Sequence, residues 1–193
     1  MIDYIKGSII QLTPAFVTVE TGGVGYFVNI SLSTFSRLEG KSDVKILIHE
    51  VIREDAHQLF GFADKEERDI FRHLISVTGV GASTARMMLS SLSPEEIEKA
   101  IVGSEVNILK SVKGIGLKTA QRIIVDLKDK LGKQSGTAEI FAFEDNTRRE
   151  EALSALVMLG FAKGAVQKVL EKISREEKNL SVEDLIKRAL KNL

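Results

Sequence analysis

Two short stretches of the chain repeat one pattern of residue types that suits anion binding. Residues 111–124, "SVKGIGLKTAQRII", hold two glycines around one apolar residue, followed by a lysine and a threonine. Residues 76–89, "SVTGVGASTARMML", repeat the glycine pair. Glycine leaves backbone amides uncovered, and the free amides and dipole at a helix start attract phosphate. Because such contacts carry no sequence information, two copies predict a sequence-independent grip on successive phosphates of a nucleic-acid strand.

The two copies predict one set of phosphate-binding residues. The apolar residue between the glycines is expected to anchor each turn in the core, and the glycines permit unusual backbone torsions. The copies differ at one position, because Ser83 stands where the second copy has Lys118. The first copy is therefore expected to rely on amides and small hydroxyls. The set is Gly79, Val80, Gly81, Ser83 and Thr84 in the first copy and Gly114, Ile115, Gly116, Lys118, Thr119 and Arg122 in the second.

Three other interpretations of the glycine pairs compete with phosphate binding. A nucleotide-binding P-loop needs Gly directly before Lys-Ser/Thr, but Leu117 separates Gly116 from Lys118. A dinucleotide-binding fingerprint needs a preceding strand, whereas both stretches follow helical segments. The glycines could also form tight turns between helices and bind nothing. The duplication and the nearby lysines favour phosphate binding over that third interpretation.

A second group of charged residues lies in "VIREDAHQ", residues 51–58, between two predicted strands. Glu54 and Asp55 there could be a solvated turn, or they could belong to a metal-dependent nuclease. No further ligand set accompanies them, and the three histidines, His49, His57 and His73, lack metal-ligand spacing. With no cysteine, thiolate sites and disulfides are excluded. The sequence therefore predicts no metal, no cofactor and no catalytic residue.

Three regions are expected to position these residues, giving a multidomain α+β fold. Residues 1–63 contain five runs rich in Val, Ile and Phe with glycine breaks, which predict a five-stranded OB-type β-barrel. Residues 64–131 have a helical period and carry both glycine pairs. Ser93, Pro94 and Glu96 have the spacing of a capping box within this all-α region.

The last part of the chain is predicted to be a separate module. Residues 132–147 lack a sustained period and predict a flexible linker. Residues 148–193 contain three helical segments, expected to form a small bundle that suits binding a protein better than catalysis. Gly160 is the expected end of the first of these helices, and Ser181 with Asp184 the expected start of the last.

Composition narrows the function classes. The 193 residues include 44% hydrophobic and 28% charged residues, which predicts a globular chain. No signal peptide or membrane-spanning run is recognisable, so a cytoplasmic protein is expected. Net charge is zero, so nucleic-acid binding must come from local charge. Basic residues cluster around the second glycine pair, namely Lys110, Lys113, Lys118, Arg122, Lys128, Lys130 and Lys133.

The paired Gly-apolar-Gly turns resemble tandem helix-hairpin-helix motifs. Together with the barrel, "REDAHQLFGF" and the final bundle, they make the whole chain similar to the bacterial RuvA family of Holliday junction branch-migration proteins. The resemblance implies a homotetramer, or two tetramers face to face, that binds four-way junction DNA in recombination, repair and the SOS response. It implies that Glu54 and Asp55 form an acidic pin near the junction centre, where carboxylates repel phosphates.

The resemblance also implies partners. The third domain would contact the hexameric ATPase RuvB through Leu156, Leu159 and Phe161, and the RuvC resolvase is a further candidate partner. Apolar residues at helical spacing are also typical of a core, so a structural role for these three remains an alternative. The expected function is that of a non-enzymatic junction scaffold, with ATP consumed by the partner. A structure-specific nuclease and a general duplex-binding or protein-interaction module are the alternatives.

Overall fold

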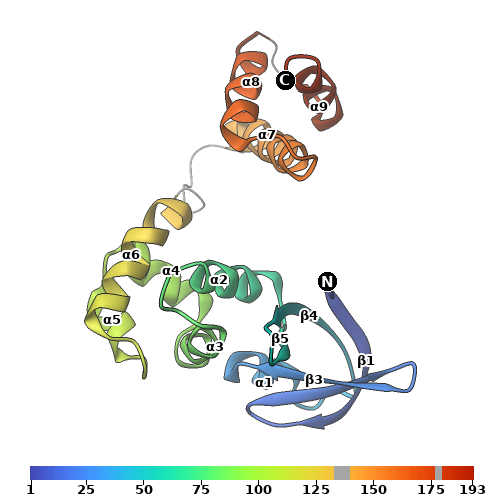
Figure 1. Cartoon of the computed structure of the whole chain (residues 1–193), viewed down its shortest axis with the longest axis vertical. Coiled ribbons are helices and arrows are strands. Elements are labelled where there is room, and N and C mark those ends of the chain that lie inside the picture. The colour runs from blue at the N-terminus through green and yellow to red at the C-terminus, as the bar shows by residue number, and fades with distance from the viewer. Residues whose placement is uncertain (133–139, 177–179) are drawn as a thin grey trace. The chain divides into compact units, whose positions relative to one another are not determined.

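A computed structural model describes residues 1–132, 140–176 and 180–193. The chain divides into two compact units, Met1–Ser135 and Gly136–Leu193. The first unit contains a β-barrel and a group of helices (Figure 1). In the second unit, the described residues form helices and no strand. Among the residues that the structure describes, none of the helices combines the length and the apolarity that crossing a membrane requires.

The N-terminal part is a closed five-stranded barrel, as the sequence predicts. The strands are β1 (Tyr4–Leu12), β2 (Phe16–Thr21), β3 (Val24–Ile30), β4 (Asp43–Ile52) and β5 (His57–Phe62). They close in the order β1-β2-β3-β5-β4. Only the β3–β5 pair is parallel, and α1 (Leu32–Leu38) lies between β3 and β4 in the chain. Inward-facing aliphatic residues such as Val17, Val28 and Ile46 are fully buried and fill the barrel.

Five helices complete the first unit and share one core. They are α2 (Lys65–Ile75), α3 (Ala82–Ser91), α4 (Pro94–Val102), α5 (Val106–Ser111) and α6 (Leu117–Gly132). Their apolar faces meet in a single cluster that also takes in Phe60 and Phe62 of β5. The capping box predicted at Ser93 is confirmed: Ser93 Oγ accepts a hydrogen bond from Glu96 N, and Glu96 Oε2 accepts one from Ser93 N.

Helix α2 joins the barrel to the other helices through an aromatic cluster. Phe71 is fully buried, and its ring lies 4.9 Å from that of Phe62 and 5.3 Å from that of Phe60. His49 of β4 completes the cluster at 5.4 Å. Burial, with the nearby Arg72 and Arg68, lowers the pKa of His49, which keeps its ring neutral at physiological pH. The barrel and the helices therefore share apolar surface on both strands of the β4–β5 hairpin.

Hydrogen bonds also fix the position of α2 on the barrel. Glu67 of α2 is fully buried, and its carboxylate accepts hydrogen bonds from Ser31 Oγ and from Thr34 Oγ1, the latter at 2.6 Å. Arg68 donates to Asp3 Oδ1 at 2.7 Å. A buried carboxylate is tolerated only when it is hydrogen-bonded, so these partners restrict how α2 can dock on the barrel. The barrel and the helices consequently form one body, within which the boundary expected near residue 63 is a change of fold type.

The second unit is a three-helix bundle made of α7 (Ile140–Met158), α8 (Lys163–Glu176) and α9 (Val182–Leu190). Its core includes Leu156, Val166, Leu170 and Leu185. Gly160, with φ of 100°, follows the end of α7, and Ser181 caps α9 by accepting from Asp184 N, both as predicted. These residues close the helices where the sequence pattern places their ends.

Helix α7 begins earlier than the sequence pattern indicates. It starts at Ile140, so residues 140–147 of the predicted linker are helical, while its residues 133–139 lie outside the described residues. Extending a helix is far easier than nucleating one. The packed half of α7, which buries Ala152 and Leu156, can therefore carry helical structure into a stretch without a helical period of its own.

Candidate nucleic-acid interface

The two glycine turns have the same backbone. Gly79 and Gly114 both have φ of 94°. The amide of Val80 donates to Val77 O at 3.0 Å, and the amide of Ile115 donates to Val112 O at 3.1 Å. From residue 76 to 85, burial matches that from 111 to 120 at every position except 82 and 117. The repeat in the sequence is therefore a repeat in structure, with α2–α3 forming one hairpin and α5–α6 the other.

The apolar residue of each turn anchors it, as predicted. Val80 and Ile115 are each 5% exposed and lie in the shared core. Val77 and Val112, three residues earlier, are buried beside them. Since both turns are tied to one core, the two helix starts are held at a fixed separation.

The two glycines of each pair occupy their positions for different structural reasons. Gly79 and Gly114 have a left-handed φ that side chains rarely adopt, so the backbone itself requires glycine there. Gly81 and Gly116 do not have such a φ, and a Cβ built on either would meet nothing within 4 Å. The fold therefore has no need of glycine at 81 or 116. The bare backbone at these two positions leaves the starts of α3 and α6 open to a ligand.

Each glycine pair is followed by uncapped helical amides. The first intrahelical bonds run from Ala85 N to Gly81 O and from Ala120 N to Gly116 O, both at 2.9 Å. The amides of residues 82–84 and 117–119 precede these bonds and have no acceptor inside their helices. Gly81 also provides no side-chain cap. Three adjacent donors at a helix start match the oxygens of a phosphate group.

Cations accompany the second hairpin. Lys118 and Arg122 are exposed, and they lie one turn apart on the same face of α6. Asp126 and Asp129 occupy the same side further along, so the positive charge of this face is limited to the start of the helix. Lys128 is directed elsewhere, because its Nζ lies 2.8 Å from Ser104 Oγ. Lys133 of the predicted basic cluster lies outside the described residues, and among the described members Lys118 and Arg122 lie nearest the start of α6 on this face.

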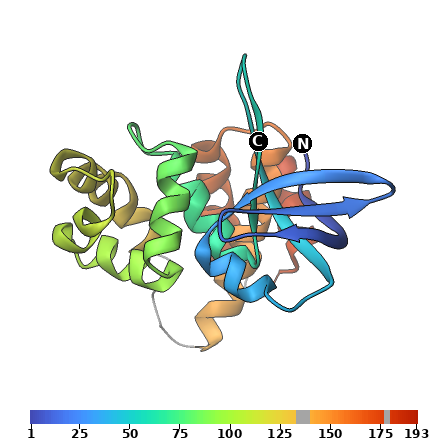
Figure 2. The same cartoon turned by 90° about the horizontal axis from the view of Figure 1, so that it is seen from below.

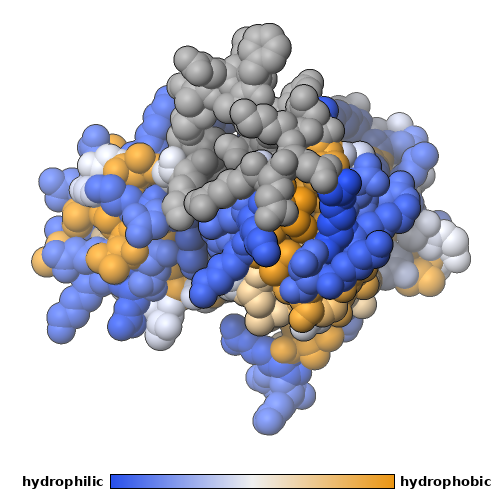
Figure 3. Space-filling view, turned by 90° about the horizontal axis from the view of Figure 1, so that it is seen from above, coloured by the Kyte–Doolittle hydropathy of each residue, from blue (hydrophilic) through white to orange (hydrophobic). Residues whose placement is uncertain are grey.

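The acidic pair lies at the end of a projecting hairpin. Strands β4 and β5 remain paired as far as Ile52 and His57, and the turn closes with a bond from Arg53 N to Ala56 O at 2.7 Å. Glu54 and Asp55 at the tip are exposed. Figure 2 shows the hairpin extending well beyond the barrel, and Figure 3 shows hydrophilic side chains at its end. Its geometry allows two negative charges to reach a position away from the rest of the unit.

Near its tip, this hairpin contains a side-chain hydrogen bond between its two strands that was not predicted. His57 Nε2 lies 2.7 Å from Glu50 Oε1, across the two strands, and Ile2 N donates to the other oxygen of Glu50 at 3.2 Å. These hydrogen bonds, with that from His57 the stronger influence, lower the pKa of Glu50. The spacing of the two residues carries no sequence signal, because their meeting depends on strand register.

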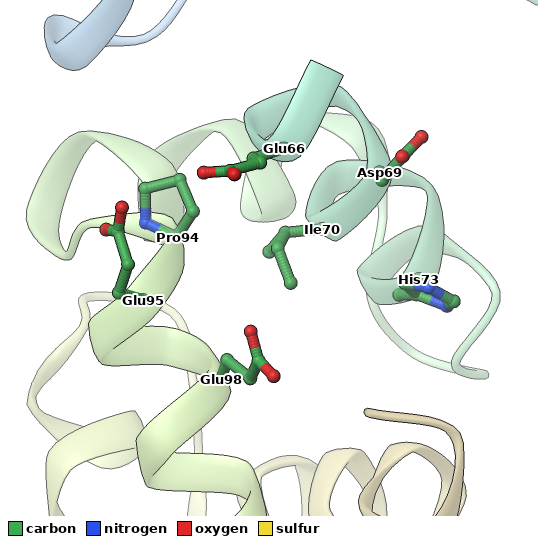
Figure 4. A pocket seen from close by; sticks show the side chains of 7 residues that line it. All are labelled: Glu66, Asp69, Ile70, His73, Pro94, Glu95 and Glu98. Carbon is green, nitrogen blue, oxygen red and sulfur yellow. The ribbon is translucent and has the colours of Figure 1, made fainter. Parts of the chain in front are cut away.

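A hollow in the first unit does not suit DNA. It lies between α2 and α4, with Glu66 and Asp69 on one side and Glu95 and Glu98 on the other (Figure 4). Burial lowers the pKa of His73, the one basic group in its lining, so the hollow carries negative charge. Phosphates would be repelled. Nor do the described residues contain a group of three or more His, Asp or Glu side chains arranged to hold a metal ion.

The residues expected to contact the motor partner differ in exposure. Leu156 is fully buried in the core of the second unit, and Phe161 packs against that core. Leu159 is 63% exposed, and its neighbour Met158, which was not predicted, is 86% exposed. Helical spacing cannot distinguish the two faces of α7 when both carry apolar residues. Leu156 therefore supports the bundle, whereas Met158 and Leu159 offer apolar surface.

Comparison with known proteins accounts for the whole chain. A family described as "RuvA N terminal domain" matches residues 1–61, "SAM-like Helix-hairpin-helix tandem" matches 71–129, and "RuvA, C-terminal domain" matches 147–193. Relatives from Christiangramia forsetii and Bacteroides fragilis are each 52% identical, and one from Porphyromonas gingivalis is 50% identical. Each alignment covers 100% of both chains, and each relative is named "Holliday junction branch migration complex subunit RuvA".

Because the two glycines of a pair have different roles, substituting one should change DNA affinity and substituting the other should change fold stability. Gly116→Leu should leave the thermal midpoint nearly unchanged, because a side chain there meets open space, but it should lower affinity for DNA about tenfold by covering the amides. Gly114→Ala should instead destabilise the fold by about 1–2 kcal/mol, because its φ is left-handed. Circular dichroism melting and fluorescence anisotropy with labelled DNA measure the two effects. Unchanged DNA affinity in Gly116→Leu would rule out the phosphate role of this turn.

Proposed function

The chain belongs to the RuvA family, and from this membership we propose that it binds four-way DNA junctions and holds them open for branch migration. The observation that carries the proposal is the pair of superimposable turns, each with an open glycine before uncapped helical amides. Such turns bind the DNA backbone without reading bases. A protein that must act on any sequence as the junction moves needs this kind of contact.

The proposed binding surface combines the two hairpins of the first unit. Backbone amides after Gly81 and Gly116 contact phosphates, and Lys118 adds a charge whose binding releases counterions from DNA. Both turns are held by one core, so they contact phosphates a fixed distance apart on one duplex arm. Affinity for any arm would fall steeply with added salt, because it depends on charge neutralisation.

Preference for a junction over a linear duplex is assigned to the β4–β5 hairpin. Glu54 and Asp55 at its tip repel phosphates, so a continuous duplex is disfavoured where the hairpin projects. At an open four-way junction, the strands diverge and leave a central space. The carboxylates can occupy that space and keep the strands from pairing again across it.

The proposed complex contains several copies of the chain and other proteins. Four copies would place one unit against each arm of the junction, and one tetramer or two face to face would enclose it. The second unit would recruit the hexameric ATPase RuvB, and RuvC is a further partner. The chain itself is proposed to be non-catalytic, with ATP hydrolysed by RuvB. The relatives' shared name, which describes one subunit of a complex, supports this division of work.

The experiment that tests the function compares an immobile four-way junction with linear duplex of equal length. Binding is measured at several stated salt concentrations, with magnesium and without ATP. We expect a strong preference for the junction, affinity that falls with salt, and no cleavage. Equal binding to both DNAs would indicate a general duplex-binding module. Cut strands would indicate a nuclease and would implicate Glu54 and Asp55.

The acidic tip gives a separate prediction. The double variant Glu54→Gln/Asp55→Asn should bind linear duplex several-fold more tightly than the wild type, while junction binding is retained, so the preference for the junction falls. Neutralising two exposed carboxylates elsewhere on the barrel, with Glu20→Gln/Glu39→Gln, is the matched control and should leave the preference unchanged. Loss of all DNA binding in the tip variant would contradict repulsion.

The exposed apolar residues after the core of α7 give a prediction about the motor. Met158→Ser/Leu159→Ser should abolish RuvB-driven branch migration and leave junction binding unchanged, because both side chains are on the surface of the second unit. Leu190→Ser, on α9 and 45% exposed, is the control and should migrate normally. A strand-displacement assay with purified RuvB measures the rate. Full migration by the double variant would remove these residues from the proposed contact.

A further inference from the structure

The two hairpins have the same backbone conformation but different charged side chains. Lys118 of the second hairpin corresponds to Ser83 of the first, and Arg122 corresponds to Met87. The first hairpin therefore has the same open turn and the same free amides, yet lacks both cations that accompany the second. Amides alone hold a phosphate more weakly than amides with a cation, because a cation adds the attraction between opposite charges to the hydrogen bonds.

The arginine within the first hairpin does not fill this gap. Arg86 lies on α3, but its Nη1 donates to Ala15 O at 3.0 Å and to Asn29 Oδ1 at 3.1 Å. Asn29 is held in turn, because its Nδ2 donates to Leu59 O at 3.1 Å. Arg86 is thus directed to the barrel, where it links α3 to β3.

A cation from the second hairpin lies at the first turn instead. Arg122 belongs to α6, yet its Nη1 is 3.4 Å from the carbonyl oxygen of Thr78. Thr78 directly precedes Gly79, so this contact reaches into the first glycine turn. The side chain of Arg122 is exposed, and a guanidinium has five N–H donors in a planar fork. Donors beyond the one facing Thr78 are available for a phosphate oxygen.

We propose that Arg122 supplies the cation of the first hairpin, so that a DNA phosphate at the start of α3 is held by amides of one hairpin and the guanidinium of the other. This inference rests on the proposed function and specifies its site. The Thr78 carbonyl orients the guanidinium, and the shared core holds α6 beside the first turn. The two hairpins then form one composite site, which explains how the first can work with Ser83 in place of a lysine.

A rescue experiment tests which hairpin Arg122 serves. Junction affinity and its salt dependence are measured for the wild type, Arg122→Gln, Lys118→Gln, and each of these combined with Ser83→Lys. We expect Arg122→Gln to lower affinity about tenfold and to reduce the salt slope by about 1, as loss of one phosphate contact does. Ser83→Lys should restore most of the affinity lost in Arg122→Gln, because it places a cation at the first turn. It should restore little in Lys118→Gln, whose loss is at the second turn.

Pairing Arg122→Gln with a blocked turn gives an independent test. With Gly81→Leu, which covers the first turn, the two losses should be strongly non-additive, because both variants remove the same phosphate contact. With Gly116→Leu, which covers the second turn, the losses should add. Lys99→Gln removes an exposed positive charge from α4 and serves as the control for net charge, with affinity expected to stay within twofold.

Three results would overturn the inference while leaving the proposed function intact. In the first, Ser83→Lys restores affinity equally in Arg122→Gln and Lys118→Gln. In the second, the loss from Arg122→Gln is non-additive with that from Gly116→Leu and additive with that from Gly81→Leu. In the third, Arg122→Gln binds the junction with wild-type affinity. Failure of the proposed function is a different observation, since the wild type would then show no preference for the junction. Thermal melting confirms that each variant is folded before binding is compared.

Discussion

The buried face of α2 is the constraint on which the rest of the first unit depends. Its Glu67 carboxylate is fully buried, and hydroxyls of Ser31 and Thr34 at the start of α1 satisfy it. Phe71, one turn later, packs on the aromatic rings of β5. Apolar contact alone would tolerate several docking angles, whereas directional hydrogen bonds to a buried charge tolerate few. The first glycine turn follows α2 directly, so this joint orients it relative to the β4–β5 hairpin.

The two hairpins are more alike in backbone geometry and buried residues than in the chemistry of their exposed side chains. Gly79 and Gly114 keep a backbone that other residues strain to adopt, and Val80 and Ile115 keep the turns anchored. The exposed positions around them are different, with Ser83 opposite Lys118 and Met87 opposite Arg122. Folding constrains the first group, because any change there disturbs the shared core. The second group is not constrained by the core, which permits the division of phosphate contacts between the two hairpins that we propose.

The placement of charged residues, and not the net charge, suits this chain to DNA binding. The net charge is zero, yet Lys118 and Arg122 lie at the start of α6, and carboxylates occupy the hairpin tip and the hollow between α2 and α4. Potentials near a protein surface follow local charge over about 8–10 Å at physiological salt. An attractive surface and a repulsive projection can therefore coexist in one unit. Under the function proposed above, that combination would favour DNA whose arms approach the hairpins and whose strands diverge at the tip.

The sequence by itself determined the fold class and the two turns. Strand alternation and helical period are local patterns, and the repeated glycine pairs predicted where the backbone is bare, because only glycine permits it. Tertiary structure decided what depends on side chains meeting from distant segments. It directed Arg86 to the barrel, brought Arg122 to Thr78, paired Glu50 with His57, and buried Leu156 while exposing Leu159. These outcomes depend on strand register and on which face of each helix the core covers, and residue spacing within one segment carries neither.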